Sequence, residues 1–181
     1  MPEELVVRHA SPTLAGMKTA NMFIYHVKSK TELSENLRKW NRILRKKGIR
    51  AIPLRYKNQN ALIYIYRVNK LACDLRDNLA ESLLRERGYS PDNPQQAIKK
   101  LITELENNES FPHEIGLFLG YPPEDVLGYI KNLKPYNLRG YWKVYENEKE
   151  KEKIFNKFRK CTKIYCEKIK EGKDIERMIL A

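Results

Sequence analysis

The stretch IRAIPLRYKNQNALIYIY, residues 49–66, holds the clearest secondary-structure pattern of the chain. Two runs rich in β-branched and aromatic residues, Ile49–Tyr56 and Ala61–Tyr66, lie on either side of the polar segment Lys57–Asn60. Such runs around a short polar segment are typical of two paired strands and their turn. The sequence therefore predicts a β-hairpin over residues 49–66.

A strand and a basic helix are predicted before the hairpin. The apolar and aromatic run Met22–Val27 is typical of a strand. Ser29 or Thr31 can cap the helix that follows, and Gly48 can end it. The apolar residues of this helix recur at i, i+4, i+7 and i+11, on one face: Leu33, Leu37, Trp40 and Leu44. Residues 5–20 show little periodicity, so we expect an irregular or single-turn segment there.

Helices dominate the remainder of the chain. Apolar periodicity and proline or glycine boundaries predict helices over Val68–Arg87, about Pro94–Asn107, His113–Leu119, Pro123–Asn132 and about 147–171. The aromatic run Tyr141–Tyr145 predicts one more strand. This order of elements indicates the α+β class. We expect a single globular domain over residues 1–181, in which a small mixed β-sheet of about four strands packs with several helices and a long C-terminal helix.

The charge balance leaves several binding functions open. The chain has 35 lysines and arginines against 23 aspartates and glutamates, a formal net charge of +12, which suits nucleic acids, anionic ligands or acidic proteins. No run approaches the roughly 20 apolar residues of a membrane span, and the first residues lack the pattern of a signal peptide. We therefore expect a cytoplasmic protein with no membrane partner. Its three cysteines lack CxxC spacing, so we expect buried thiols and no metal site, and the sequence identifies no cofactor.

The segment FPHEIGLFLGYP, residues 111–122, is the most unusual part of the chain. Two glycines interrupt its apolar run, which predicts a close backbone approach because glycine costs roughly 0.5–1 kcal/mol in a helix. His113 and Glu114 are candidate catalytic residues, since histidine titrates near neutrality and glutamate can orient it. Leu117 stands where the second histidine of a zinc-protease HExxH motif would be. The alternative is structural, with His113 packing at a helix start and Glu114 complementing the helix dipole.

Two other segments are candidates for ligand binding. In the segment His9–Lys18, Thr13 and Lys18 can hold an anion, although the phosphate-binding pattern GxxxxGK[ST] is absent. His9 is a third candidate catalytic residue. Trp142 and Lys143 can line a cleft for a planar ligand. Ordinary turn chemistry in the first segment and strand packing in the second are the structural alternatives.

A basic region raises a nucleic-acid hypothesis. Nine lysines and arginines and no acidic residue lie between Arg38 and Lys57. The residues that would contact phosphates are Arg38, Arg42, Arg45 and Lys46. Trp40 lies on the leucine stripe and is therefore expected in the core. A solvated basic face is the alternative.

Residues 114–130 resemble the apolar skeleton of a helix-turn-helix. Ile115, Leu119 and Val126 occupy its apolar positions. A DNA-reading helix places hydrogen-bond donors at its N-terminal end. Glu124 and Asp125 stand there instead and would repel phosphate, so the pattern favours a compact helical hairpin over a DNA reader.

Three blocks of the sequence together resemble a known family. They are His9 with Pro12–Lys18, Phe111–Pro122 with Asp125 and Val126, and Gly140–Tyr145. In this order they are similar to the prokaryotic family of domain of unknown function 3793, over almost the whole chain. The resemblance implies that the blocks belong to one domain, around one site, and it implies no activity. Members often have a cysteine after the first histidine, where this chain has Ala10, so a thiol mechanism at that position is not expected.

These observations give three functional hypotheses. The leading one is a cytoplasmic domain that binds a small anionic ligand or cofactor, at a polar site made by the His9–Lys18 and His113–Glu114 segments. It requires His9 and His113 to meet in space. The second is a nucleic-acid-binding protein that uses the basic region 38–57 and the helical hairpin 114–130. The third is an interaction module for an acidic protein. The sequence leaves open whether the chain is an enzyme.

Overall fold

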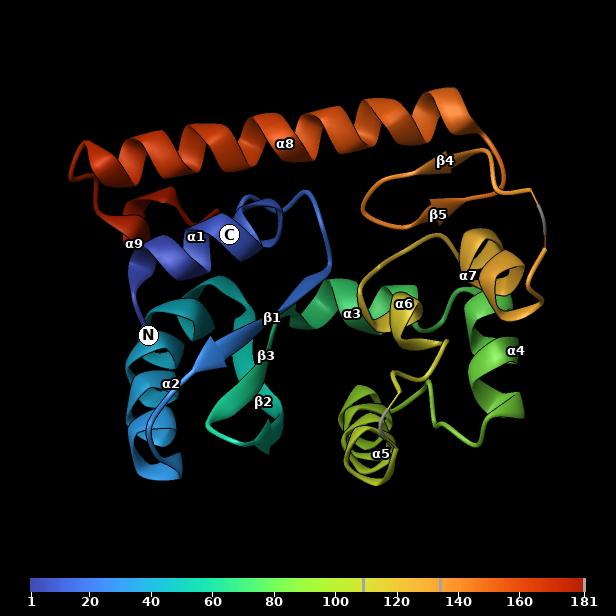
Figure 1. Cartoon of the computed structure of the whole chain (residues 1–181), viewed down its shortest axis with the longest axis horizontal. Coiled ribbons are helices and arrows are strands. Elements are labelled where there is room, and N and C mark those ends of the chain that lie inside the picture. Colours follow the sequence, from blue (N-terminus) through green and yellow to red (C-terminus); the bar gives the residue numbers. More distant parts are fainter. Residues whose placement is uncertain (109, 134, 181) are drawn as a thin grey trace. The chain divides into compact units, whose positions relative to one another are not determined.

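The computed structural model describes residues 1–108, 110–133 and 135–180 (Figure 1). The chain divides into two compact units. Unit 1 comprises Met1–Asn69 and Phe158–Ala181, and unit 2 comprises Lys70–Lys157. The predicted α+β class is confirmed, because several helices accompany two small antiparallel sheets. The expectation of a single domain over residues 1–181 is not tested by this division and stays a prediction.

A three-stranded antiparallel sheet lies in unit 1, with the strand order β1-β3-β2. Its strands are β1 (Ala20–His26), β2 (Ile49–Lys57) and β3 (Asn60–Arg67). Strands β2 and β3 form the predicted hairpin. Its two loop residues, Asn58 and Gln59, have φ angles of 50° and 60°, which is the left-handed conformation that a tight two-residue hairpin turn requires.

The strand pairing explains which strand is central. Strand β3 pairs with β1 from Asn60 to Tyr66 and with β2 along its other edge, so it is buried over almost its whole length. The register of β2 shifts between Pro53 and Arg55. A proline beside a bulge on an edge strand is tolerated because its missing N–H removes no ladder bond from the interior.

Three helices complete the core of unit 1. Helices α1 (Glu3–Leu14) and α2 (Lys30–Leu44) pack with the sheet, and the short helix α9 (Ile175–Met178) contributes Ile175 to the same cluster. The predicted stripe of α2 is buried as expected. The Ser29 side chain accepts a hydrogen bond from the Glu32 amide. After the 3-10 turn η1 (Arg45–Lys47), Gly48 has a φ of 67° and ends the helical segment, as predicted.

Helix α1 corrects the expectation of an irregular segment over residues 5–20. Its buried face contains Val6, Val7, Ala10 and Leu14, spaced so that they fall on one side of a helix. Pro12 made the segment look irregular. It lies in the last turn, where its missing N–H costs one hydrogen bond and where the helix ends two residues later.

Unit 2 is mostly helical. Its helices are α3 (Val68–Asp74), α4 (Asn78–Glu86), α5 (Pro94–Asn107), α6 (Ile115–Phe118), α7 (Pro123–Ile130) and the start of α8 (Glu148–Lys170). Helix α5 spans the predicted residues. The single helix expected over Val68–Arg87 is instead two helices, because the Asp77 side chain accepts hydrogen bonds from the Leu79 and Ala80 amides and starts a new helix there.

The second sheet is also in unit 2 and consists of β4 (Leu138–Arg139) and β5 (Lys143–Val144). It corrects two details of the expected sheet. All pairings among the described strands are antiparallel rather than mixed. The strand predicted at Tyr141–Tyr145 is shorter and pairs with its close neighbour in sequence, which closes a much smaller loop than pairing with the larger sheet would. Among the described helices, none has the length and apolarity that crossing a membrane would need.

Candidate functional site

Unit 2 contains a pocket of ≈ 160 Å³ formed by α6, α7 and the segment around β5. The rings of four residues line it: His113, Tyr121, Tyr129 and Trp142. Ile115, Gly116 and Val126 add apolar wall, and Asp125 and Lys143 add charge. Its volume is similar to that of cavities of about 150 Å³ that hold a single benzene ring. Three residues singled out by the sequence, His113, Trp142 and Lys143, therefore lie at one pocket.

Stacked aromatic side chains fix the walls of this pocket. Tyr121 stacks on Trp142 with ring centroids 4.9 Å apart, and Trp142 meets Phe155 edge to face at 4.5 Å. His113 contacts Tyr129 edge to face at 5.2 Å. Burial raises the pKa of Tyr121 to about 12, so its phenol is protonated at neutral pH. The pocket therefore has rigid aromatic sides.

Asp125 anchors the pocket from the first turn of α7. Its carboxylate accepts one hydrogen bond from the Trp142 indole at 2.8 Å and one from the Tyr145 amide at 2.7 Å. The Lys151 ammonium of α8 lies 3.8 Å from the same carboxylate and 2.9 Å from that of Glu124. Asp125 is only 2% exposed. It therefore joins α7, the β5 segment and α8, and sets the orientation of the Trp142 ring.

This arrangement bears on the helix-turn-helix pattern at 114–130. Helix α6 has 4 residues and α7 has 8. The acidic residues at the start of α7 bind partners within unit 2, as the Trp142 and Lys151 contacts show. The hairpin is thus built as a wall of the pocket, and nothing in its geometry favours DNA reading.

Lys143 carries the positive charge at the pocket. Its ammonium lies 5.0 Å from the centre of the Tyr129 ring and 5.2 Å from that of Tyr136, within the range of cation–π attraction. In the described part of the chain, it has no carboxylate partner. Tyr129 and Tyr136 are themselves 42% and 39% exposed. An ammonium held between two accessible rings is available to an anion that enters the pocket.

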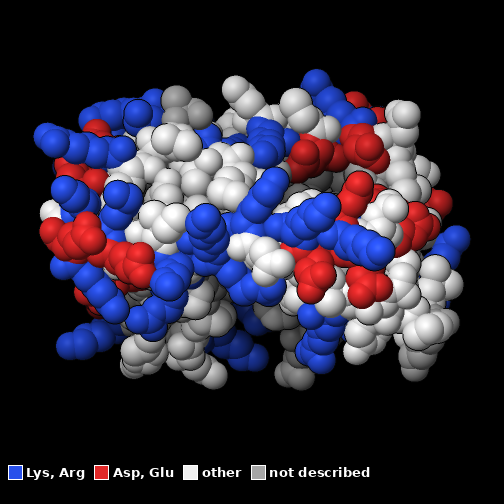
Figure 2. All heavy atoms as spheres, turned by 90° about the horizontal axis from the view of Figure 1, so that it is seen from above, with Lys and Arg blue, Asp and Glu red and all other residues white. Residues whose placement is uncertain are grey.

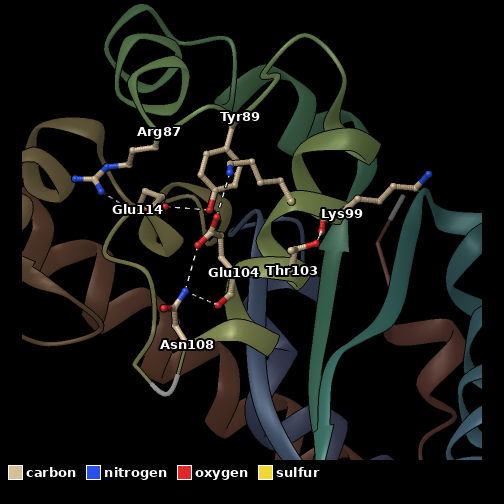
Figure 3. A network of polar contacts seen from close by, with 8 residues as sticks. Arg87, Tyr89, Lys99, Thr103, Glu104, Asn108 and Glu114 are labelled. Carbon is tan, nitrogen blue, oxygen red and sulfur yellow. Dashed lines mark hydrogen bonds and ion pairs between the residues drawn. The ribbon is translucent and has the colours of Figure 1, made fainter.

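Glu114 lies in a network of polar contacts with Tyr89 and Arg87 (Figure 3). It is 4% exposed, accepts a hydrogen bond of 2.9 Å from the Tyr89 hydroxyl and lies 3.5 Å from the Arg87 guanidinium. Burial and the Glu114 charge raise the pKa of Tyr89. Glu104 lies in the same network, paired with Lys100 at 3.1 Å. These contacts tie Glu114 to Tyr89 and Arg87 in the turn before α6, and Glu114 does not line the pocket. Its role as a catalytic residue beside His113 stays a prediction.

The glycine that interrupts α6 allows close packing at the pocket. A Cβ on Gly116 would lie 2.8 Å from Val126 Cγ2 and 3.0 Å from Tyr121 Cδ2. Both distances are shorter than ordinary contacts, so a larger residue would displace the pocket wall. Gly120 has a φ of 69° and ends α6 in the left-handed conformation. The predicted close backbone approach is confirmed for Gly116.

Comparison with known families shows which family the chain belongs to. The model of a family described as "Protein of unknown function (DUF3793)" matches residues 6–179. The chain belongs to this family. No curated protein and no solved structure matches it. In this DUF3793 chain, the pocket brings together two of the three sequence blocks, those around His113 and Trp142.

The third block of the DUF3793 pattern, His9–Lys18, lies in unit 1 and is occupied by internal contacts. His9 is exposed and stacks on Phe23 at 5.1 Å, and partial burial and the Arg8 charge lower its pKa. The buried Thr13 hydroxyl donates to Asn21 at 2.7 Å, and the buried Lys18 ammonium donates to the Ala20 carbonyl. These contacts suit a structural role. That His9 and His113 share a site stays a prediction, because they belong to different units.

Arg67, which the sequence did not single out, binds the backbone at the end of α1 in the first block. Its guanidinium donates to the carbonyls of Thr13, Leu14 and Leu180 at 2.7, 2.9 and 2.8 Å. The carbonyl end of a helix carries partial negative charge. The end of α1 therefore attracts cations, and Arg67 fills this position.

Sequence reasoning also missed Tyr89, Tyr121, Asp125 and Tyr129 as functional or anchoring residues. For Asp125 a signal existed, because a carboxylate inside the apolar run after Pro122 and Pro123 must find partners. The tyrosines gave none, since their roles depend on tertiary contacts.

The cysteines and possible metal ligands of this DUF3793 chain are dispersed. All three cysteines are free. Cys161 is buried, Cys166 is intermediate and Cys73 is exposed, so the expectation of buried thiols was wrong for Cys73. It lies on the outer side of the short helix α3, of which only Leu71 is buried. Within residues 1–108, 110–133 and 135–180, no three His, Cys, Asp or Glu side chains converge as metal ligands would.

Proposed function

We propose that unit 2 is a binding domain for a small planar anion, acting in the cytoplasm. The ring of the ligand would lie among the aromatic walls of the pocket, and its negative group would meet the Lys143 ammonium. One observation carries this proposal. A pocket of ≈ 160 Å³, lined by four aromatic rings, includes a lysine that has no carboxylate partner in the described chain.

The charges of the pocket support an anion over a cation. The Asp125 carboxylate already accepts hydrogen bonds from Trp142 and Tyr145, so both of its oxygens are engaged. Among the described residues, Lys143 contacts the faces of two tyrosines and has no carboxylate partner. His113, which is exposed and lines the pocket, can supply a further donor. A ligand with a negative group therefore finds donors here, whereas a cation would face Lys143.

The size of the pocket supports a ligand with one ring. Polar atoms at the rim are few, which is usual for small-molecule sites, where apolar walls contribute area and a few polar groups fix the orientation. Aromatic rings stacked face to face or edge to face gain about 0.5–1.5 kcal/mol beyond burial. A flat ligand would gain such contacts from Tyr129 and Trp142 together.

Three probes with the same ring and different charge test this proposal: benzoate, benzyl alcohol and benzylamine. The readout is the indole N–H resonance of Trp142 in nitrogen-15 NMR spectra, distinguished from that of Trp40 with a Trp40→Phe variant. We expect benzoate to shift the Trp142 resonance at the lowest concentration. Lys143→Met should weaken benzoate binding about two- to fivefold, as loss of one accessible ion pair implies. It should leave benzyl alcohol unchanged.

Lys131→Met is the matched control. Lys131 is exposed, follows α7 directly and does not line the pocket, so benzoate binding should stay near that of the unmodified chain. Equal responses to all three probes would remove the preference for anions. No Trp142 shift with any probe up to about 10 mM, where even weak fragment binding is visible, would remove the binding site itself.

A further inference from the structure

The net positive charge of the chain lies entirely in one of its two units. Unit 1 has 21 lysines and arginines against 8 aspartates and glutamates, a net charge of +13. Unit 2 has 14 against 15, a net charge of −1. Together they account for all 181 residues and the net charge of +12. Unit 1 therefore presents a surface suited to a large polyanion.

Within unit 1, three arginines form a stripe along α2 and the first residue of the 3-10 turn η1. Arg38, Arg42 and Arg45 are spaced i, i+4 and i+7, so they share one face, opposite the buried stripe that contains Leu37 and Trp40. All three arginines are exposed. Arg38 donates to Ser34 at 3.3 Å. In the described part of the chain, none of the three is paired with a carboxylate. We call these three residues the arginine stripe.

The stretch of sequence that contains the arginine stripe has no acidic residue. The sequence from Asn36 to Cys73 contains no aspartate or glutamate. Lys46, one of the residues expected to contact phosphates, differs from the stripe because it pairs with Glu176 at 3.0 Å. Its charge is thus partly neutralised within the unit.

The stripe is held on a rigid element. The Asn41 side chain donates to the Ala51 carbonyl at 2.8 Å and accepts from the Ala51 amide at 3.0 Å, so it ties α2 to the edge strand β2. Seven residues of helix place the first and last arginine about 10 Å apart along its axis. Guanidinium groups bind phosphate oxygens with two parallel hydrogen bonds. Three of them in line match successive phosphates of one strand.

Trp40 indicates which kind of nucleic acid fits. It is 6% exposed, and its indole donates to the Met1 carbonyl at 2.9 Å, so it offers no face to an unpaired base. Proteins that bind single strands combine basic residues with accessible aromatic rings. The stripe has arginines alone. It therefore suits the backbone of a duplex, without reading of its sequence.

Helix α8 shows the same division of charge along its length. Its part in unit 1, residues 158–170, has five lysines and arginines and one glutamate, whereas acidic and basic residues alternate over residues 148–153. Figure 2 shows the face that carries α8. Basic side chains are visible along it, and acidic side chains are visible toward both of its ends.

We propose that unit 1 binds the phosphate backbone of a nucleic-acid duplex, with the arginine stripe as its contact residues. This inference stands on the charge distribution of unit 1 and is independent of the pocket in unit 2. The proposed nucleic-acid surface lies in the basic region 38–57, and the helical hairpin at 114–130 is not part of it.

Fluorescence anisotropy with a labelled 20-base-pair duplex tests the proposal, with DNA and RNA of the same sequence as separate probes. We expect binding at 50 mM salt that weakens steeply toward 200 mM. A variant in which Arg38, Arg42 and Arg45 are all replaced by glutamine should lose about three phosphate contacts. Each phosphate contact contributes about −0.9 to the slope of the logarithm of affinity against the logarithm of salt concentration. Between 50 and 200 mM salt, the variant should therefore lose about 40-fold less affinity than the unmodified chain loses.

The matched control replaces Lys149, Lys153 and Lys157 by glutamine. These lysines are exposed and lie on α8 within unit 2, and replacing them removes the same total charge as replacing the arginine stripe. The salt dependence of duplex binding should therefore change little. Circular dichroism should show both triple variants folded, because every replaced residue is exposed. The single variant Arg42→Glu should weaken duplex binding as well. It replaces the triple variant in this test if the triple variant does not fold.

Four outcomes would overturn the inference. They are an equal effect of the two triple variants, no binding of either duplex at 50 mM salt, tighter binding of a single strand than of a duplex, and stripe-dependent binding of polyglutamate that displaces the duplex. The last outcome would identify the surface as one for acidic proteins. Similar binding of DNA and RNA duplexes supports backbone recognition, and a strong preference for one would show that helix shape is read as well.

Discussion

Replacing Asp125 by asparagine tests whether one buried carboxylate holds the pocket together. The carboxylate uses one oxygen for the Trp142 indole and the other for the Tyr145 amide. Asparagine keeps one acceptor oxygen and puts an NH₂ group in the place of the other. One of the two donors then loses its partner and faces another donor, and the Lys151 ammonium loses a neighbouring negative charge.

The expected loss of stability in Asp125→Asn follows from these contacts. A hydrogen bond to a charged group is worth about 1.5–3 kcal/mol, and leaving a buried donor unsatisfied costs about 1–3 kcal/mol. These contributions overlap, so we expect a loss of about 3 kcal/mol in the free energy of unfolding. With a urea dependence of about 2 kcal/mol per molar, the midpoint should fall by about 1.5 M. The assay is urea denaturation followed by circular dichroism, with the Trp142 indole resonance as a local readout.

The neighbouring residue provides the control. Glu124 pairs with the same Lys151 at 2.9 Å, but its side chain is 36% exposed, whereas that of Asp125 is 1% exposed. Glu124→Gln should therefore cost only about 0.5 kcal/mol, as accessible ion pairs do, and should leave the Trp142 resonance in place. Equal midpoint shifts for the two variants, or an unchanged Trp142 resonance in Asp125→Asn, would refute the anchoring role.

Two further predictions concern packing and ionisation. Gly116→Ala should lower the free energy of unfolding by about 1 kcal/mol, because the cost of overpacking Val126 and Tyr121 exceeds the helix propensity gained. It should also weaken benzoate binding, and an unchanged benzoate titration would count against the role of Gly116 in shaping the pocket wall. Burial raises the pKa of Cys161 from 9.0 to about 11, so the stability that its neutral thiol contributes is complete below pH 9 and is lost as the pH rises toward 11. The difference in unfolding free energy between the unmodified chain and Cys161→Ala should shrink over this window by roughly 1.4 kcal/mol per pH unit, and a difference independent of pH between 8 and 11 would contradict the raised pKa.

Local patterns were sufficient to predict much of the fold. The hairpin follows from two β-branched runs around Asn58 and Gln59, and α2 follows from its leucine stripe and the Ser29 cap. Helix α1 was missed because Pro12 looks like a helix breaker, and its tolerance in the last turn depends on where the helix ends. The break after α3 was missed because Asp77 acts as a cap only when the chain turns there.

The candidate site was predictable only where the residue types are unusual. His113, Trp142 and Lys143 stood out by composition, and the structure places them at one pocket. The direction of Glu114 depends on Tyr89, which lies 25 positions earlier in the chain. No pattern of spacing contains such a contact. The aromatic walls likewise arise from pairs such as Tyr121 and Trp142, which meet only after α7 and the β5 segment have folded.

The division of the chain has a consequence for synthesis. Unit 2 is one continuous segment, Lys70–Lys157, whereas unit 1 is made of two segments that flank it. The core of unit 1 needs Ile175 and Ile179, and Arg67 needs the Leu180 carbonyl. During synthesis, the whole of unit 2 is therefore made before α9, which the first segment of unit 1, Met1–Asn69, needs to complete its core. The arginine stripe belongs to the segment that is made first, so the proposed contact with a duplex would not have to wait for unit 1 to be complete.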